Sequence, residues 1–286
     1  MKNKLKKLYK SINTLRGKGR AFIYLKSGKK PWSRGYNEFK WKMIKTVISD
    51  PKVLEVFKTG KALPEKYCFG LDERVIEFPW LISQMPDRPI DILDAGSTLN
   101  HEIILDHPVF KNKKITIANI VPEHNCFYNR GISYILSDIR KMPFKGDLFD
   151  MITCISTLEH VGMDNTIIYS KENKYQENNK WLYMEAVEEL MRVLKSGGKL
   201  LITVPFGVYE NHRFFQQFDH EMVKKISDKF PSQVNETYFK YGEGWQKADL
   251  KAAADSHYFD IHTNKNIRED RLAAAQAVVC LEITKK

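Results

Sequence analysis

Short apolar runs recur along the chain from residue 90 onward, with polar segments between them. Each run has the length of a β-strand, and the runs are Ile90–Leu93, Ile115–Ala118, Ser133–Leu136, Met151–Ile155, Leu200–Val204 and residues 276–283. Residues 181–195 lie between the predicted strands Met151–Ile155 and Leu200–Val204. Their apolar side chains recur at helical spacing, which predicts a helix that ends at Gly197-Gly198. Buried strands that alternate with helices are typical of a parallel α/β sheet with right-handed crossovers. Because ligands bind such sheets beyond the carboxyl ends of the strands, the loops that follow them predict one binding rim.

The first 85 residues have a different pattern. A short basic helix with one apolar face is predicted near the start, with lysines between Leu5, Leu8, Ile12 and Leu15. Residues 36–48 and 72–84 also look helical, and Pro79 is expected to interrupt the second. We therefore expect a basic arm and helical cap over residues 1–85 and an α/β domain over residues 86–286.

The loop after the first predicted strand is the first candidate for ligand binding. Residues 91–100 read DILDAGSTLN, with Asp94 two positions before Gly96. A dinucleotide loop requires G-x-G-x-x-G, and two of these three glycines are absent here. Asn100 tolerates left-handed backbone geometry better than most residues, so we expect it to stand where a glycine would.

This loop and four later segments resemble the class I S-adenosylmethionine-dependent methyltransferases. The later segments are ITIANIVPE (115–123), LSDIRKMPF (136–144), FDMITCISTLEHVG (149–162) and MRVLKSGGKLLITVPFG (191–207), in the family's order. The resemblance implies S-adenosylmethionine as cofactor. It also implies a three-layer Rossmann-like fold, with a mostly parallel seven-stranded sheet, helices on both faces and, here, an N-terminal helical arm.

The same resemblance implies a set of cofactor contacts. The family's second strand ends in an acid that holds the ribose hydroxyls, and Asn119 stands at that position. Asp138 matches the acid that meets the adenine amino group, with Ile139 against the ring. The implied cofactor-binding residues are Asp94, Gly96, Ser97, Asn119, Asp138, Ile139 and Ser156.

Other pieces resemble a bacterial branch of the family that is associated with surface-polysaccharide and glycan biosynthesis. These pieces are RVIEFPW (74–80), DAGSTLNHE (94–102), PFGVYENHRFFQQFDHEM (205–222) and DRLAAAQAVVCLE (270–282). This resemblance implies O-methylation of a sugar-linked or other small-molecule acceptor.

His160 is the candidate general base. Methyl transfer from a sulfonium uses a donor that is already activated, so the protein mainly positions the acceptor, and a hydroxyl acceptor benefits from a base. His160 follows the fourth strand at the rim, directly after Glu159. The alternative is that both residues anchor the loop by hydrogen bonds.

The segment after the fifth strand mixes aromatic and polar side chains, which suits a sugar. The candidate substrate-binding residues are Glu159, Tyr209, His212, Arg213, Asp219 and His220. The alternative is a surface helix with an aromatic inner face. No spacing among the acids and histidines is diagnostic of a metal, so we expect none. Residues 163–180 are polar and long for a connector, which predicts either a lid or a solvated insertion.

The charge of the chain is concentrated in the arm. The formal charge is +11 at pH 7, but residues 1–45 hold 15 Lys and Arg against one acid, so the remainder carries −3. Phosphate attraction would favour a nucleic-acid partner. The apolar face of the arm instead favours a membrane surface or a partner protein, and a solvated tail that orders over the cofactor is a third interpretation. Because the body has no basic excess, we expect no specific nucleic-acid partner.

Several absences bear on location and on function. No apolar stretch reaches the length of a membrane span, the N-terminus lacks the apolar core of a signal peptide, and the four cysteines form no C-x-x-C pair. We expect a cytoplasmic protein, with peripheral contact to the inner face of the membrane as an option. Two other functions remain open, namely methylation of RNA or protein, and a non-catalytic cofactor-binding partner protein.

Overall fold

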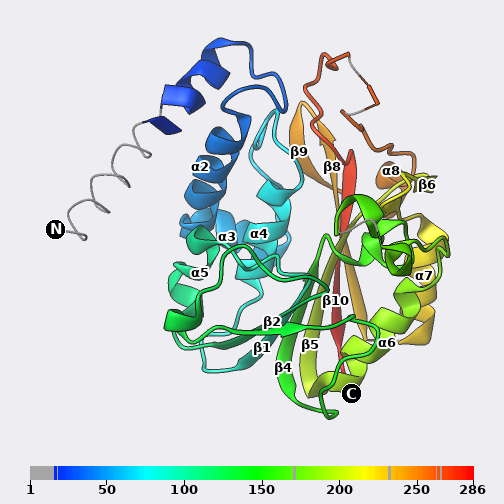
Figure 1. Ribbon diagram of the computed structural model, residues 1–286. Coiled ribbons are helices and arrows are strands. Elements are labelled where there is room, and N and C mark those ends of the chain that lie inside the picture. Colours follow the sequence, from blue (N-terminus) through cyan, green and yellow to red (C-terminus); the bar gives the residue numbers. More distant parts are fainter. Residues whose placement is uncertain (1–15, 18, 170–171, 231–232, 262, 265) are drawn as a thin grey trace.

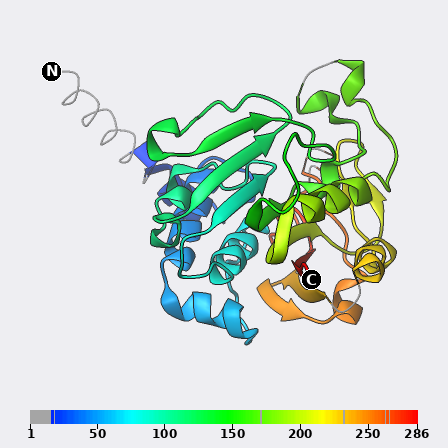
Figure 2. The same ribbon diagram turned by 90° about the horizontal axis from the view of Figure 1, so that it is seen from below.

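The computed structural model describes residues 16–17, 19–169, 172–230, 233–261, 263–264 and 266–286. The basic helix predicted from Leu5 to Leu15 lies outside these residues. The described chain forms three layers, with a central sheet covered by helices on both faces (Figure 1; Figure 2). This arrangement confirms the predicted Rossmann-like α/β fold.

The sheet has the strand order β3-β2-β1-β4-β5-β10-β8-β9. Strands β1 to β5 are parallel to one another, whereas β10 is antiparallel to both β5 and β8. The strands are β1 (Asp91–Ala95), β2 (Lys114–Asn119), β3 (Ser133–Leu136), β4 (Phe149–Ile155), β5 (Leu194–Pro205), β8 (Val234–Gly242), β9 (Gly244–Ala248) and β10 (Ala277–Thr284). Two short strands, β6 (Glu210–Asn211) and β7 (Gln216–Gln217), pair beside the main sheet.

The prediction of seven strands was wrong by one, because β9 adds an eighth at the edge. It forms a hairpin with β8, and its free side meets the cap, where the Trp245 backbone N–H donates to the Tyr67 carbonyl at 2.8 Å. Gly244 makes this approach feasible: its φ is +115°, and a Cβ there would lie 2.6 Å from the Lys66 backbone. The extra strand is therefore stabilised by a contact with a distant part of the chain.

Each face of the sheet has its own helices and its own apolar core. One face packs against α2 (Tyr36–Ile48), α3 (Pro51–Thr59), α4 (Arg74–Ser83) and α5 (Glu102–Leu105). The other packs against α6 (Tyr183–Val193), α7 (His220–Lys229) and α8 (Leu250–Ala253). Short 3-10 turns occupy Pro108–Phe110, Tyr128–Arg130, Leu158–His160, Asn165–Ile167 and Asn173–Tyr175. Among the described residues, no helix combines the length and the apolar character needed to cross a membrane.

Helix α4 continues through Pro79, contrary to the expected interruption. Proline has no N–H, so it cannot donate to the carbonyl four residues earlier. That carbonyl belongs to Val75, and the Tyr67 hydroxyl donates to it at 3.0 Å. The lost helical hydrogen bond is therefore replaced by a tertiary one, which the local sequence could not reveal.

A buried carboxylate joins the cap to the sheet. Glu77 on α4 is fully buried, and its Oε1 accepts hydrogen bonds from the hydroxyls of Ser156 and Thr203, each at 2.6 Å. Its Oε2 accepts from Arg74 Nη1 at 2.8 Å. Since Ser156 and Thr203 lie at the carboxyl ends of β4 and β5, the cap is held at the rim where the ligand loops converge.

Candidate functional site

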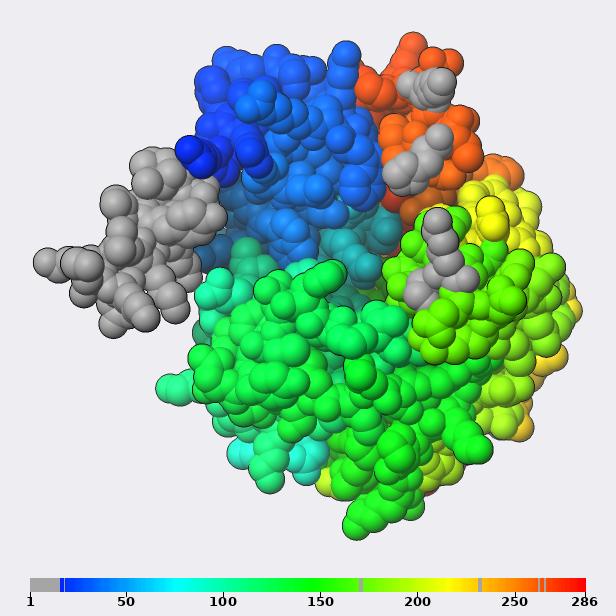
Figure 3. All heavy atoms as spheres, in the orientation of Figure 1, coloured from blue at the N-terminus to red at the C-terminus, as the bar shows by residue number. Residues whose placement is uncertain are grey.

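The carboxyl ends of β1 to β4 border a cavity of about 280 Å³. The molecular surface is hollowed where the cap, in blue, faces the green segments that follow these strands (Figure 3). One side of the cavity, which we name the strand-edge wall, consists of Gly96, Ala118, Asn119, Ile120, Ser137, Asp138, Ile139, Arg140 and Thr157. The opposite side, the insertion wall, consists of Asn165, Tyr169, Lys174, Tyr175 and Glu177, and His160, Val161 and Gly162 lie between the two walls.

The loop after β1 is positioned by Asp94 and opened by Gly96. Asp94 is fully buried, and its carboxylate accepts from the Leu99 N–H at 2.7 Å and from the Thr153 hydroxyl at 2.9 Å. Burial raises the pKa of Asp94 to about 7. A Cβ at Gly96 would lie 2.0 Å from Thr157 Oγ1, and the φ of Gly96 is +103°. Asp94 thus holds the loop after β1 through its hydrogen bond to the Leu99 N–H. Gly96 allows this loop to approach Thr157 in the loop after β4.

The residue that takes the left-handed conformation in this loop is Ser97, with φ 67°, and not Asn100 as predicted. Asn100 instead forms hydrogen bonds to later segments of the chain. Its side-chain N–H donates to Glu123 Oε2 at 3.0 Å, and its side-chain oxygen accepts from the Tyr134 hydroxyl at 2.8 Å. The Ser97 hydroxyl is buried without a hydrogen-bond partner. The loop is therefore formed with fewer glycines because one serine accepts a strained backbone.

Asn119 lines the cavity at the end of β2, and a carboxylate lies beside it. Its side-chain oxygen accepts from the Ile120 N–H at 2.8 Å, and its amide donates to Glu123. Glu123 therefore receives hydrogen bonds from both Asn119 and Asn100. Glu123 lies within the segment 115–123. Its contact with Asn119 depends on the turn after β2, which brings Glu123 back to the end of that strand.

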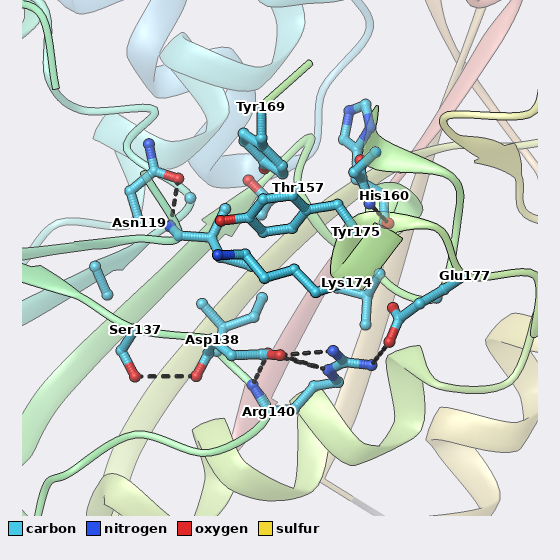
Figure 4. A pocket seen from close by; sticks show the side chains of 17 residues that line it. Asn119, Ser137, Asp138, Arg140, Thr157, His160, Tyr169, Lys174, Tyr175 and Glu177 are labelled. Carbon is cyan, nitrogen blue, oxygen red and sulfur yellow. Dashed lines mark hydrogen bonds and ion pairs between the residues drawn. The ribbon is translucent and has the colours of Figure 1, made fainter. Parts of the chain in front are cut away.

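Asp138 lines the cavity after β3 but is already bound by Arg140 (Figure 4). Arg140 Nε lies 3.0 Å from each carboxylate oxygen of Asp138, and Arg140 Nη1 reaches Glu177 at 2.8 Å. Burial alone would raise the pKa of Asp138, but the hydrogen bonds from Arg140 outweigh it and hold that pKa below its ordinary value. Arg140 consequently links the strand-edge wall to the insertion wall.

His160 stands at the edge of the cavity away from Asp138 (Figure 4). Its Nδ1 lies 2.8 Å from the Phe214 carbonyl oxygen. Since a carbonyl can only accept, Nδ1 carries the hydrogen, and Nε2 is left as a hydrogen-bond acceptor. Burial lowers the pKa of His160 to about 4, so the neutral imidazole predominates at neutral pH. A neutral ring with a defined tautomer can accept a proton from a bound hydroxyl.

Two predicted site residues near His160 contact the protein and do not line the cavity. Ser156 has φ 42° and donates its hydroxyl to Glu77. Glu159 is 4% exposed, one of its carboxylate oxygens has no hydrogen-bond partner, and burial raises its pKa well above the ordinary value. Both side chains face α4 of the cap, which carries Glu77 and Arg74.

The candidate substrate-binding residues after β5 lie outside the cavity. Asp219 caps the N-terminus of α7 by accepting from the Met222 N–H at 2.9 Å, and the neighbouring His220 is exposed. His212 Nε2 contacts Glu210 at 2.9 Å, and its ring stacks on Phe215 with centroids 4.5 Å apart. The remaining two, Tyr209 and Arg213, are likewise absent from the cavity lining.

The polar segment 163–180 forms the insertion wall. Asp164 holds its start, accepting from Arg213 Nε at 3.0 Å, and the Tyr169 and Tyr175 rings lie 5.7 Å apart. In Figure 4, Tyr175 and Lys174 extend across the cavity. Sequence patterning identified the segment but none of these side chains, because its length and polarity were the only signal. Within the described part of the chain, no three His, Cys, Asp or Glu side chains gather as a metal site.

Parts of the chain are similar to known proteins. Residues 113–202 match the family model described as a methyltransferase domain. A segment of 70 residues is 33% identical to an uncharacterized protein of Methanocaldococcus jannaschii, and it spans 24% of this chain and 22% of that protein. The match therefore covers about a fifth of the length of this relative.

Solved structures with a similar fold include several methyltransferases. The N-methyltransferase NodS of Bradyrhizobium japonicum, in complex with S-adenosylhomocysteine, is 12% identical, with 86% of this chain and 98% of that chain covered and a TM-score of 0.42. A putative sarcosine dimethylglycine methyltransferase of Galdieria sulphuraria is also 12% identical, with 74% and 86% covered and a TM-score of 0.46. Similarities this low carry no conclusion about activity.

Residues 113–202 are therefore similar to a methyltransferase domain, and they lie within a sheet of Rossmann-like arrangement. The cavity lies at the carboxyl ends of the strands within and beside the matched residues, where ligands bind in sheets of this kind.

Proposed function

We propose that this protein transfers a methyl group from S-adenosylmethionine to a hydroxyl of a small, sugar-linked acceptor in glycan biosynthesis. One observation carries the proposal: Gly96, Asn119, Asp138 and His160, which lie at or just after the carboxyl ends of four different strands, line the same cavity. Gly96, Asn119 and Asp138 stand at the positions that the methyltransferase resemblance assigns to cofactor contacts. His160 is a neutral histidine that would serve as the base.

The residues present fit the cofactor. Gly96 leaves space where any side chain would collide with Thr157. Asn119 lines the cavity at the end of β2, where its side chain would meet the ribose hydroxyls, and Glu123 would hold that side chain in place. Asp138 would accept from the adenine amino group, with Ile139 against the ring. When bound, the cofactor supplies an activated, electrophilic methyl group.

His160 would act on the acceptor. Its Nε2 would take the hydroxyl proton as the acceptor oxygen forms its bond to the methyl carbon and the carbon–sulfur bond breaks. The Phe214 carbonyl supports this role because it holds Nδ1 in the protonated form. A base of this kind contributes about a hundredfold or more to the rate.

The cavity is too small to hold the cofactor and an acceptor together. Ligand sites usually occupy about 300–1,000 Å³, and this cavity is near the lower end. The insertion wall would therefore move outward to admit an acceptor beside the cofactor. The sugar-linked class rests on the resemblance of residues 205–222 and 270–282 to the glycan-associated branch, and RNA or protein acceptors are the competing classes.

Thermal unfolding with separate ligands tests the cofactor. S-adenosylmethionine and S-adenosylhomocysteine should raise the midpoint, since a ligand at a hundred times its Kd stabilises the folded state by about 2.7 kcal/mol. NAD should leave the midpoint unchanged. A shift with NAD alone would refute the proposal.

Transfer of labelled methyl groups tests the acceptor. Nucleotide sugars should be methylated in preference to RNA or protein. Methylation of RNA alone would refute the sugar-linked class, and cofactor binding without turnover on any acceptor would favour the non-catalytic alternative.

A further inference from the structure

An exposed apolar and basic surface lies on the N-terminal part of the described chain. Phe22 is 59% exposed, Ile23 43%, Leu25 38% and Trp32 42%. Only five other large apolar side chains of the described residues are comparably exposed, and they are dispersed over residues 128–208. We name these four side chains and the cations around them the N-terminal surface. Such clusters of exposed apolar groups mark sites of interaction.

The surface is attached firmly to the body of the protein. Residues 19–26 are helical, and their inward side chains Ala21 and Tyr24 are buried. The Tyr24 hydroxyl donates to the Gly70 carbonyl at 3.1 Å, just before α4. Trp32 is also held, because its Nε1 donates to the Ala273 carbonyl at 2.6 Å. The outward side chains are therefore presented from an ordered support.

The charge around these side chains has one sign. The exposed cations between residues 16 and 34 are Arg16, Arg20, Lys26, Lys30 and Arg34, and no acid occurs before Glu38. Arg20 pairs with Glu38 at 3.1 Å, and Lys26 lies 5.6 Å from the Phe22 ring. Because residues 46–286 carry −3, the positive charge is concentrated in the N-terminal part of the chain.

We propose that the N-terminal surface binds an anionic lipid bilayer. Phe, Ile and Leu side chains on a short helix enter the region between headgroups and acyl chains, while flanking Lys and Arg meet the lipid phosphates. Trp32 adds exposed ring area at the same boundary, while its N–H is held by the Ala273 carbonyl. A nucleic-acid partner would explain the cations but not the exposed Ile23 and Leu25.

The N-terminal surface and the cavity lie at the same end of the molecule. Figure 1 shows this segment, in dark blue, at the end of the molecule toward which the parallel strands point. The cavity lies at that same end of the sheet. Bilayer binding would therefore bring the rim close to acceptors that are attached to lipid.

Sedimentation of the full chain with vesicles tests the proposal. The protein should bind vesicles of phosphatidylcholine mixed with phosphatidylglycerol and bind phosphatidylcholine alone much more weakly, and salt should reduce the difference. Phe22→Ser with Ile23→Ser and Leu25→Ser should lower the affinity on the order of tenfold. Lys26→Gln with Lys30→Gln should also lower it on the order of tenfold and flatten the salt dependence.

Tyr128→Ser is the matched control, because Tyr128 is 66% exposed but lies outside the N-terminal surface. It should bind vesicles like the unchanged protein, and thermal midpoints should show that all variants fold. The proposal is overturned if the unchanged protein binds neither vesicle, if it binds both equally, or if the triple variant retains full affinity. Cofactor binding is measured on the same samples, so failure here is distinct from failure of the methyltransferase proposal.

Discussion

The two walls of the cavity are held in place by different forces. The strand-edge wall is supported by buried hydrogen bonds, such as those that Asp94, behind Gly96, accepts from the Leu99 N–H and the Thr153 hydroxyl. The insertion wall is tied to the body by ion pairs that solvent reaches, namely Arg140–Glu177 and Arg213–Asp164. Exposed pairs contribute at most about 1 kcal/mol, whereas buried hydrogen bonds are costly to break. The comparison indicates that one wall is preorganised and the other can open, and four changes test this difference.

The largest effect is expected at Gly96 in the strand-edge wall. Gly96→Ala should lower the free energy of unfolding by more than about 2 kcal/mol and abolish cofactor binding, because the new Cβ meets Thr157 and a positive φ is itself costly. Urea unfolding and calorimetric titration measure the two effects. Gly131→Ala is the matched control: its φ is +76° but nothing lies within 4 Å, so only the backbone cost of about 1–2 kcal/mol should remain. Equal effects of both changes would show that the close approach of the loops does not matter.

His160, between the walls, should affect turnover without affecting cofactor affinity. His160→Ala should reduce kcat about a hundredfold or more, and His212→Ala, which changes a histidine outside the cavity, should not. The base must be unprotonated, and burial lowers its pKa to about 4. Activity of the unchanged protein should therefore stay level as pH falls from 8 to 5 and decline only near pH 4. A decline centred near pH 6.5 would assign the base to another group.

Asp138 should affect cofactor affinity to an intermediate degree. Asp138→Ala removes an acceptor for the adenine amino group, and a hydrogen bond to a charged group contributes about 1.5–3 kcal/mol, or roughly tenfold to over a hundredfold in Kd. Arg140→Gln is a useful companion, because it breaks the ion pair but leaves the carboxylate free to accept. If Arg140→Gln weakens binding as much as Asp138→Ala does, the arginine holds the carboxylate in its binding position. Unchanged Kd in Asp138→Ala, measured calorimetrically, would refute the assigned contact.

The smallest effect is expected in the insertion wall. Glu177→Gln should accelerate cofactor release about two- to fivefold, since it removes a partly exposed ion pair that contributes at most about 1 kcal/mol. Stopped-flow displacement measures the rate. Asp228→Asn, which breaks the exposed Lys224–Asp228 pair on α7, is the matched control and should leave release unchanged. Release that slows in Glu177→Gln would contradict an opening wall.

The strand-edge wall was largely predictable from the sequence. Apolar runs located β1 to β5 within a few residues, except that β5 begins at Leu194, before the glycine pair. Because the ends of parallel strands meet at one edge, the order of the strands was enough to bring Asn119, Asp138 and His160 together. Residues 36–48 match α2 for the same reason: helical periodicity is a local property.

The insertion wall and the surroundings of the rim were not predictable in this way. The Arg140–Glu177 pair joins residues 37 positions apart, and Trp245 of β9 pairs with Tyr67 of the cap. Tyr209, His212, Arg213, Asp219 and His220 follow β5, yet none of them lines the cavity. Contacts of this kind depend on the direction of a loop in space, on which periodicity carries no information.

The sequence by itself determined the alternation of strands and helices, the need for Gly96 in a nucleotide-type loop, and the concentration of charge in the first 45 residues. These follow from local patterning and composition. Only the tertiary structure decided that Ser97 takes the strained conformation, that α4 continues through Pro79, and that Asp138 is shared with Arg140. In α4 the Tyr67 hydroxyl replaces the hydrogen bond that Pro79 cannot make, and at Asp138 the distant Glu177 binds the other end of Arg140. Such contacts exist only once the chain is folded.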